Sequence, residues 1–167
     1  MTILIDVPND ARALRDAFAC YPSGVTALCA VVNGTPIGMA ASSFTSVSVE
    51  PPLVSVCIQN NSATWRHLKD ASRIGVSVLG ANHDAACKSL SSKNGDRFAG
   101  LDWSATEQRA IFINGATAYL DCSVYTSFEA GDHAIVLLRI HALGTCPDIE
   151  PLVFHGSRLR RLSPIPS

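Results

Sequence analysis

Residues 38–52 read GMAASSFTSVSVEPP, and five of them are small hydroxyl side chains that stand between Ala41 and Val49. Short hydroxyls and backbone N–H groups suit the polar edge of a planar, largely apolar ring, because burying a hydrogen-bonded hydroxyl costs far less than burying an unpaired charge. The neighbouring Gly38 and Ala40 are small enough for such a ring to lie against the backbone. A strand with one solvated Ser/Thr face explains the same pattern, so this stretch alone leaves both interpretations open.

A second group of polar residues, Asn60, Asn61, Ser62 and Thr64, stands where a helix is predicted to begin. Free N–H groups and the helix dipole at such a position favour a bound phosphate. Ser62 is also an ordinary N-cap residue, which is the more frequent role for a serine at this place.

The polar loop SSKNGDRFAG at residues 91–100 adds two cations, Lys93 and Arg97. Cations of this kind pair with phosphate, and a solvated charged loop is the alternative. A ring site lined by hydroxyls, a phosphate site at a helix start and a cationic loop together match flavin mononucleotide (FMN), which joins a flat ring to a phosphate.

These groups are carried by a chain that the sequence divides into short strands with brief helices between them. Strands are predicted at residues 25–32, 35–40, 53–59, 73–80, 118–128, 134–143 and 151–162. Helices are predicted at residues 8–20, 63–71 and 82–90, with Asn9 or Asp10 as the first cap. Asn33-Gly34 predicts a hairpin turn between the first two strands. About seven closely spaced strands predict a mainly β fold, an antiparallel barrel rather than a doubly wound sheet.

The composition predicts one globular domain over residues 1–167. Hydrophobic residues make up 47% of the chain and charged residues 16%, with 14 acidic against 13 basic side chains. This balance argues against a nucleic-acid partner, which would select for a basic surface. The low charged fraction indicates that part of the surface is covered by a second subunit, so we expect a homodimer.

The distribution of cysteine and histidine predicts no metal site. The six cysteines form no CxxC pair, and the five histidines form no HxH or i, i+4 pair. Thiols inside apolar runs suit a reducing compartment. The start MTILIDVPND lacks the features of a signal peptide, and no apolar run approaches the roughly 20 residues that span a bilayer. We therefore expect a cytoplasmic protein without a membrane partner.

Several enzyme classes lack their signature in this chain. GxSxG, GxxxxGK[ST], HExxH and GxGxxG are all absent.

Four segments nevertheless occur in an ordered set: PSGVTALCAVVNGTPIGMAASSFTSVSVEPPLVSVCI, NNSATWRHL, KNGDRFAG and EAGDHAIVLLRI. Together they resemble the flavin reductase family, the small reductase partners of two-component flavin monooxygenases. The resemblance runs across roughly residues 10–162, and GMAASSFTSVSVEPPL at residues 38–53 is its most specific part.

The resemblance implies an FMN-binding split β-barrel that forms a homodimer, with the flavin near the subunit interface. It also implies an NAD(P)H:flavin oxidoreductase that transfers hydride from NADH or NADPH to FMN or FAD and supplies the reduced flavin to a separate monooxygenase. Such a transfer requires two stacked rings at near-attack distance and the exclusion of water, so a Rossmann motif is not needed.

Carried over residue by residue, the resemblance implies a binding site and one catalytic residue. The residues that line the flavin ring would be Ala41, Ser42, Ser43, Phe44, Thr45 and Ser46. Those that hold the ribityl chain and phosphate would be Asn60, Asn61, Ser62 and Thr64, closed by Lys93, Arg97 and Phe98. His133 would lie beside the nicotinamide, where it positions the carboxamide or supplies a proton. A histidine at the start of an apolar strand is about as often structural.

The chain departs from the family near its C-terminus. It reads FHGSRLR at residues 154–160, where family members often carry an arginine-rich segment similar to YHRGRYR. No cofactor contact is therefore assigned to His155 or Arg158. Two other functions share the binding features: a noncatalytic FMN carrier, and a flavin oxidase of the same barrel that acts directly on a small substrate, as pyridoxamine-phosphate oxidases do.

Overall fold

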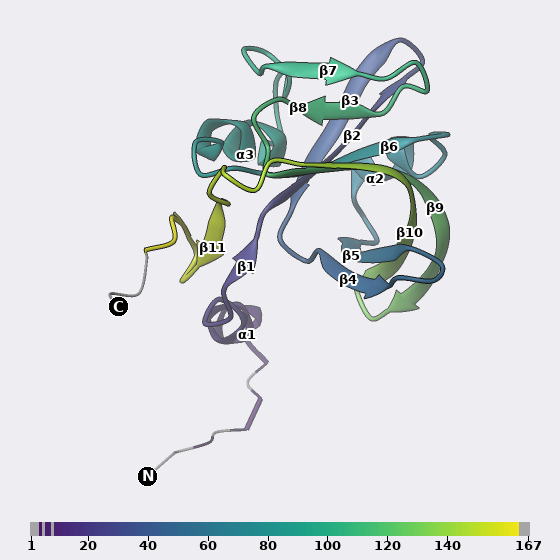
Figure 1. The fold of residues 1–167 in the computed structure, drawn as a ribbon. Coiled ribbons are helices and arrows are strands. Elements are labelled where there is room, and N and C mark those ends of the chain that lie inside the picture. Colours follow the sequence, from purple (N-terminus) through teal and green to yellow (C-terminus); the bar gives the residue numbers. More distant parts are fainter. Residues whose placement is uncertain (1–3, 5, 8, 164–167) are drawn as a thin grey trace.

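The computed structural model describes residues 4, 6–7 and 9–163, which form a mainly β structure with three short helices (Figure 1). The helices are α1 (Ala11–Phe18), α2 (Ala63–Leu68) and α3 (Asp84–Ser91). The strands are β1 (Ser23–Gly24), β2 (Thr26–Val32), β3 (Thr35–Ala41), β4 (Thr45–Ser48), β5 (Leu53–Gln59), β6 (Ile74–Val78), β7 (Trp103–Ala105), β8 (Ile111–Ile113), β9 (Ala118–Ala130), β10 (His133–Thr145), β11 (Val153–His155) and β12 (Arg158–Arg160). The prediction of a mainly β fold is confirmed.

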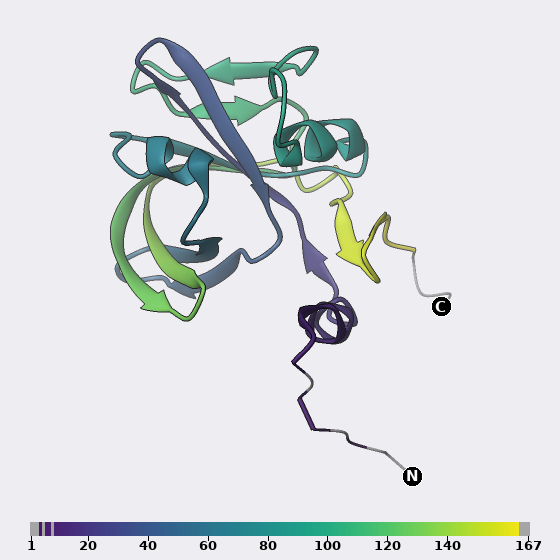
Figure 2. The same ribbon diagram turned by 180° about the vertical axis from the view of Figure 1, so that it is seen from behind.

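Seven of the strands form one antiparallel sheet in the order β3-β2-β6-β9-β10-β5-β4. The long hairpin β9–β10 curves strongly in both views (Figures 1 and 2). Irregularities in its pairing, between Leu137 and Leu138 and between Ile140 and Ala142, allow this curvature. The two edge strands, β3 and β4, are consecutive in the chain, so residues 42–44 connect one edge of the sheet to the other.

The predicted hairpin between β2 and β3 is present. Asn33 and Gly34 both adopt positive φ angles, 51° and 80°. Positive φ at both central residues is the requirement of a type I′ turn, which asparagine and glycine meet at low cost. The turn pairs Val32 with Thr35 and so sets the register of the whole β2–β3 ladder.

Strand β2 lies between two hydrophobic clusters because its successive side chains point to opposite faces of the sheet. Leu28 and Ala30 belong to one cluster and Ala27 and Cys29 to the other. Helix α2 contributes Leu68 to the first cluster, whereas α3 contributes Ala86 and Leu90 to the second. Both helices are thus anchored beside β3, which contacts each of them.

The prediction of one strand over residues 151–162 is wrong. The segment folds back as the hairpin β11–β12, in which Phe154 pairs with Leu159. Gly156 and Ser157 at its turn have φ angles of 60° and 58°. Two consecutive residues in this left-handed region reverse the chain, and they interrupt the single strand that the sequence predicted.

Helix α1 and the hairpin β11–β12 lie at the same end of the molecule (Figures 1 and 2). Gly156 N donates to Ala19 O at 2.8 Å, which links the two segments. Asp10 caps α1 by accepting from Arg12 N at 2.8 Å, as one of the two predicted caps. None of the residues of α1 is buried. Within the described part of the chain, no helix has the length and apolar character required to cross a membrane.

Candidate functional site

Three cavities lie along β3 and the residues that follow it. The first, here named the Arg97 cavity, has a volume of about 480 Å³ and is lined by Thr35, Pro36, Ile37, Gly38, Ala63, Thr64, His67, Lys93, Gly95, Asp96, Arg97 and Phe98. The second, the Ser62 cavity, has about 330 Å³ and is lined by Met39, Ala40, Ala41, Ser42, Ser43, Cys57, Ile58, Gln59, Ser62 and His133. The third, the Phe18 cavity, has about 500 Å³ and is lined by Arg15, Phe18, Ala19, Tyr21, Ser23, Ser42, Ser43, His133, Phe154 and Ser157.

The three cavities adjoin one another. The Ser62 and Phe18 cavities share Ser42, Ser43 and His133 as a common wall. The Arg97 and Ser62 cavities are lined by neighbouring residues on two elements, along β3 and at the start of α2. A ligand longer than one ring system can therefore extend from one cavity into the next.

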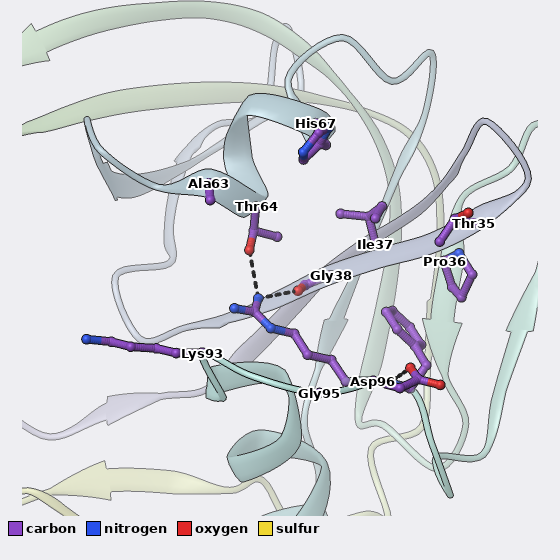
Figure 3. Close-up of a pocket in the computed structure, with 12 residues that line it drawn as sticks. Thr35, Pro36, Ile37, Gly38, Ala63, Thr64, His67, Lys93, Gly95 and Asp96 are labelled. Carbon is purple, nitrogen blue, oxygen red and sulfur yellow. Dashed lines mark hydrogen bonds between the residues drawn. The ribbon is translucent and has the colours of Figure 1, made fainter.

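Arg97 links the loop at residues 91–100 to Gly38 on β3 and to Thr64 on α2 by two hydrogen bonds, which Figure 3 draws as dashed lines. Its Nη1 donates to Gly38 O at 2.9 Å and to Thr64 Oγ1 at 2.8 Å. Because both bonds come from Nη1, the edge formed by Nε and Nη2 makes none within the part of the chain that the structure describes. This edge carries the two parallel donors that bind a phosphate in a bidentate manner.

The position of Arg97 depends on Phe98, whose ring is buried with 6% of its surface exposed. The ring packs edge-on against Trp103 at 5.8 Å between centroids and belongs to the second hydrophobic cluster. A Cβ on Gly38 would lie 2.8 Å from Phe98 and 2.5 Å from the sulfur of Cys29. Only glycine therefore lets β3 approach the loop this closely.

Ser62 acts as the N-cap of α2. Its Oγ accepts from Trp65 N at 3.2 Å, which is the structural alternative that the sequence left open. The hydroxyl oxygen of Thr64 accepts from Arg97, and its proton is left to donate to a ligand. Thr64 and Arg97 thus form one bonded pair at the cavity wall.

Ser43 uses its hydroxyl within the protein. Its Oγ donates to Cys57 O and accepts from Cys57 N, both at 2.9 Å. These bonds attach residues 42–44, the segment that connects β3 to β4, to the backbone of β5. Ser42 is exposed and lines both the Ser62 cavity and the Phe18 cavity.

His133 stands at the junction of the Ser62 and Phe18 cavities, as the first residue of β10. Its Nδ1 lies 2.7 Å from Asp132 Oδ1. A carboxylate only accepts hydrogen bonds, so Nδ1 is the protonated nitrogen and Nε2 is left for other contacts. The hydrogen bond from His133 lowers the pKa of Asp132, which keeps this carboxylate ionised.

Asn60 supports the turn that carries His133. Its backbone N–H donates to Asp132 O at 3.0 Å and its side-chain Nδ2 donates to Gly131 O at 3.2 Å. The end of β5 is thereby tied to the β9–β10 turn. A direct contact from Asn60 to a ligand stays a prediction.

The cavities bring together most of the residues predicted for the site, with some exceptions. The predicted site residues that line none of the three cavities are Phe44, Thr45, Ser46, Asn60 and Asn61. Phe44 packs against the first hydrophobic cluster, and Thr45 and Ser46 are exposed on the edge strand β4. Residues 39–43 line the Ser62 cavity, whereas the ring site was predicted at residues 41–46, and the roles of all these residues stay predictions.

The sequence reasoning missed the Phe18 cavity. Its walls come in part from α1 and from the hairpin β11–β12, which lie about 140 residues apart in the chain. A signal was present in the sequence, because a helix at residues 8–20 places Leu14, Ala17 and Phe18 on one face. In the structure Phe18 is 70% exposed and packs into neither cluster. His67 and Ile37 in the Arg97 cavity were missed as well.

The thiols and possible metal ligands contribute little to the site. Burial raises the pKa of Cys29 and of Cys122 to about 12, so both stay protonated and inert near neutral pH. All six cysteines are free. No group of three potential metal ligands is found among the residues that the structure describes.

Comparison with known proteins places this geometry in a family. The sequence model of the family described as "flavin reductase like domain" matches residues 18–163 of this chain. An NADH-dependent FAD reductase of Streptomyces globisporus is 36% identical over 166 residues, which cover 96% of this chain and 90% of that protein. The reductase subunit of a flavin-dependent monooxygenase from Rhodococcus jostii is 30% identical over 155 residues, covering 93% and 80%.

A solved structure agrees with these relatives. The NADH:FAD oxidoreductase of Streptomyces globisporus C-1027, in complex with NAD and FAD fragments, superposes with a TM-score of 0.90 at 36% identity and covers 98% of each chain. The matched family description, the relatives and this shared fold together show that the chain belongs to the flavin reductase family.

Proposed function

We propose that the chain is an NAD(P)H-dependent flavin reductase that passes hydride from a nicotinamide to FMN or FAD. One observation carries the proposal: two ring-sized cavities meet at a shared wall of Ser42, Ser43 and His133. A redox reaction between two flat rings needs this arrangement, in which each ring has its own cavity and the two faces meet.

The residues present fit a flavin in the Ser62 cavity. Small side chains at residues 40–43 leave room for a ring against the strand. In the adjoining Arg97 cavity, Nε and Nη2 of Arg97 are left for a ligand, because Nη1 makes the bonds to Gly38 and Thr64. When bound, the flavin supplies the hydride acceptor. Thr64, Lys93 and Arg97 would hold its phosphate by charge and hydrogen bonding.

The protein's own part in the reaction is positioning. Ser43 fixes residues 42–44 to β5, and Asn60 fixes the turn that carries His133. With Nδ1 bonded to Asp132, Nε2 of His133 is left to hold the nicotinamide carboxamide or carry a proton at the wall that the two cavities share. The Phe18 cavity, on the other side of His133, would receive the nicotinamide.

We also propose that the chain is a homodimer of split barrels. Apolar side chains are exposed on the β9–β10 hairpin, where Phe128 is 55% exposed and is paired with Ile135. Tyr125 on β9 and Val47 on β4 are exposed as well. Light scattering coupled to size exclusion tests the assembly, and Phe128→Glu should shift a dimer toward monomer.

The proposed cellular role follows from the relatives. The Rhodococcus protein is named as the reductase subunit of a flavin-dependent monooxygenase, and we propose that this chain, as a single domain, likewise supplies reduced flavin to a separate monooxygenase. Six free thiols favour the cytoplasm as its location.

Steady-state oxidation of NADH and NADPH, with and without added FMN or FAD, tests the proposal. Turnover that rises with added flavin supports a reductase. Absence of flavin-stimulated turnover with either nicotinamide refutes it, and tight FMN binding without reduction would indicate a flavin carrier instead. Turnover of a small amine or alcohol substrate without a nicotinamide would indicate an oxidase.

A further inference from the structure

Strand β10 presents a row of side chains that point away from the first hydrophobic cluster. Val136 and Leu138 belong to that cluster, so the residues that alternate with them point to the opposite, outer face of the sheet. This outer row consists of His133, Ile135, Leu137 and Arg139. One end of the row therefore lies at the proposed site, where His133 separates the two cavities.

The middle of the row is apolar and continues onto the neighbouring strands. Residues that pair directly across an antiparallel ladder share a face of the sheet. Ile135 pairs with Cys57 on β5 and with Phe128 on β9, and all three side chains are exposed. Apolar side chains that lie exposed together on three strands favour contact with another protein surface.

The two ends of the row carry opposite charges. At one end the Asp132 side chain, which accepts from His133 Nδ1, is 90% exposed. At the other end Arg139 is exposed, and it takes part in none of the salt bridges found among the described residues. His133 and Arg139 are about 20 Å apart along the extended strand, so Arg139 does not reach Asp132 of its own chain.

This order of groups is complementary to a second copy of itself. Two subunits related by a two-fold axis use the same surface, which must therefore be self-complementary. When the two β10 strands run antiparallel, with the axis midway between Ile135 and Leu137, the Asp132 end of each copy faces Arg139 of the other. Parallel strands would instead place Arg139 opposite Arg139, and like charges that face each other weaken an interface. Stacked sheets lie about 10 Å apart, a gap that an arginine and an aspartate side chain span together.

We infer that two copies of this chain pack the outer faces of β10 together in the antiparallel arrangement, and that Arg139 of the partner subunit bonds Asp132 at the edge of the site. The inference rests on the proposed function, which places His133 beside the nicotinamide. Arg139 of the partner subunit is then a positioning residue, because it holds the carboxylate that orients the His133 ring. Each site is complete only in the dimer.

Charge reversal tests this arrangement without any turnover. Arg139→Glu and Asp132→Arg should each raise the Kd of the dimer about tenfold to a hundredfold, because each brings like charges together at both contacts. An equimolar mixture of the two variants should form heterodimers with a Kd within about threefold of the wild-type value, because both contacts of a heterodimer again join opposite charges. Sedimentation velocity measures the Kd, and native mass spectrometry identifies the heterodimer by its mass.

Arg66→Glu is the matched control, because Arg66 is exposed on α2 and does not belong to the row. It should leave the Kd unchanged by itself, and it should not rescue Asp132→Arg in a mixture. A monomeric wild-type protein would overturn the inference. A mixture of Arg139→Glu and Asp132→Arg that associates no better than either variant alone would overturn it as well.

The role of Arg139 at the site is measured separately. Arg139→Met should raise KM for NADH about two- to fivefold at protein concentrations that keep the dimer intact, and Arg139→Lys should largely restore it. Arg139→Met added to Asp132→Asn should raise KM no further, because both substitutions remove the same contact. An unchanged KM in Arg139→Met would overturn the positioning role.

Failure of the reductase proposal looks different. In that case the wild-type protein oxidises neither nicotinamide when flavin is added, whatever its state of association. Rescue of association in the mixture of variants would support the antiparallel arrangement even then.

Discussion

Replacement of Arg97 by methionine should separate FMN binding from riboflavin binding. Methionine keeps an apolar stem of similar length but removes the guanidinium, which bonds Gly38 O at 2.9 Å and Thr64 Oγ1 at 2.8 Å. A hydrogen bond between charged groups contributes about 1.5–3 kcal/mol, so FMN affinity should fall about tenfold to a hundredfold. Riboflavin lacks the phosphate, and its affinity should change much less.

The same substitution should also lower the stability of the ligand-free protein. Two hydrogen bonds from a half-buried guanidinium to neutral oxygens are lost, each at about 0.5–1.5 kcal/mol. Urea unfolding should therefore show a loss of about 1–3 kcal/mol. Arg66→Met is the matched control, because Arg66 is exposed on α2 and lines none of the three cavities.

A double-mutant cycle with Thr64→Val tests whether the two residues act as one unit. Since Arg97 and Thr64 are bonded, their effects on FMN affinity should be less than additive, with a coupling of about 0.5–1.5 kcal/mol. Titration by quenching of flavin fluorescence measures all four proteins. Equal losses of FMN and riboflavin affinity would show that Arg97 does not bind the phosphate, and strictly additive effects would show that Arg97 and Thr64 do not act as one unit.

Three further substitutions test the structure around the site. Gly38→Ala should destabilise the protein by about 1–3 kcal/mol in urea unfolding, because its Cβ would meet Cys29 and Phe98, and Cys29→Ala in the same chain should recover part of the loss. Burial raises the pKa of Cys29 from 9.0 to about 12, so its contribution to stability should be complete below pH 9 and fall by up to about 1.4 kcal/mol per pH unit as pH rises through this range. Cys29→Ala should remove this part of the fall and leave the part that comes from Cys122, and an unchanged slope would contradict it. Asp132→Asn should raise KM for NADH about two- to fivefold with little change in flavin affinity, because it weakens the hydrogen bond that orients His133. A loss of flavin affinity with an unchanged KM for NADH would contradict the role of His133 beside the nicotinamide.

Local patterns in the sequence predicted the strands β2, β3, β5, β6, β9 and β10, but not the short strands β7 and β8. Asn33-Gly34 formed the expected turn, and the alternation of Leu120, Cys122 and Val124 placed these residues toward the first cluster. Such features depend on neighbouring residues in the chain. The prediction of one strand over residues 151–162 failed because the turn at Gly156-Ser157 depends on two positive φ angles, which the sequence did not indicate.

The sequence by itself determined the residue types of the site, its mainly β fold and its family. Only the tertiary structure decided which polar groups are already used within the protein: Ser43 by Cys57, Ser62 by Trp65, and Asn60 by the turn before His133. It also decided that α1 and the hairpin β11–β12 form a third cavity. The physical reason is that a hydroxyl or amide has few hydrogen bonds to make, and residues far apart in the chain determine how many of them remain for a ligand.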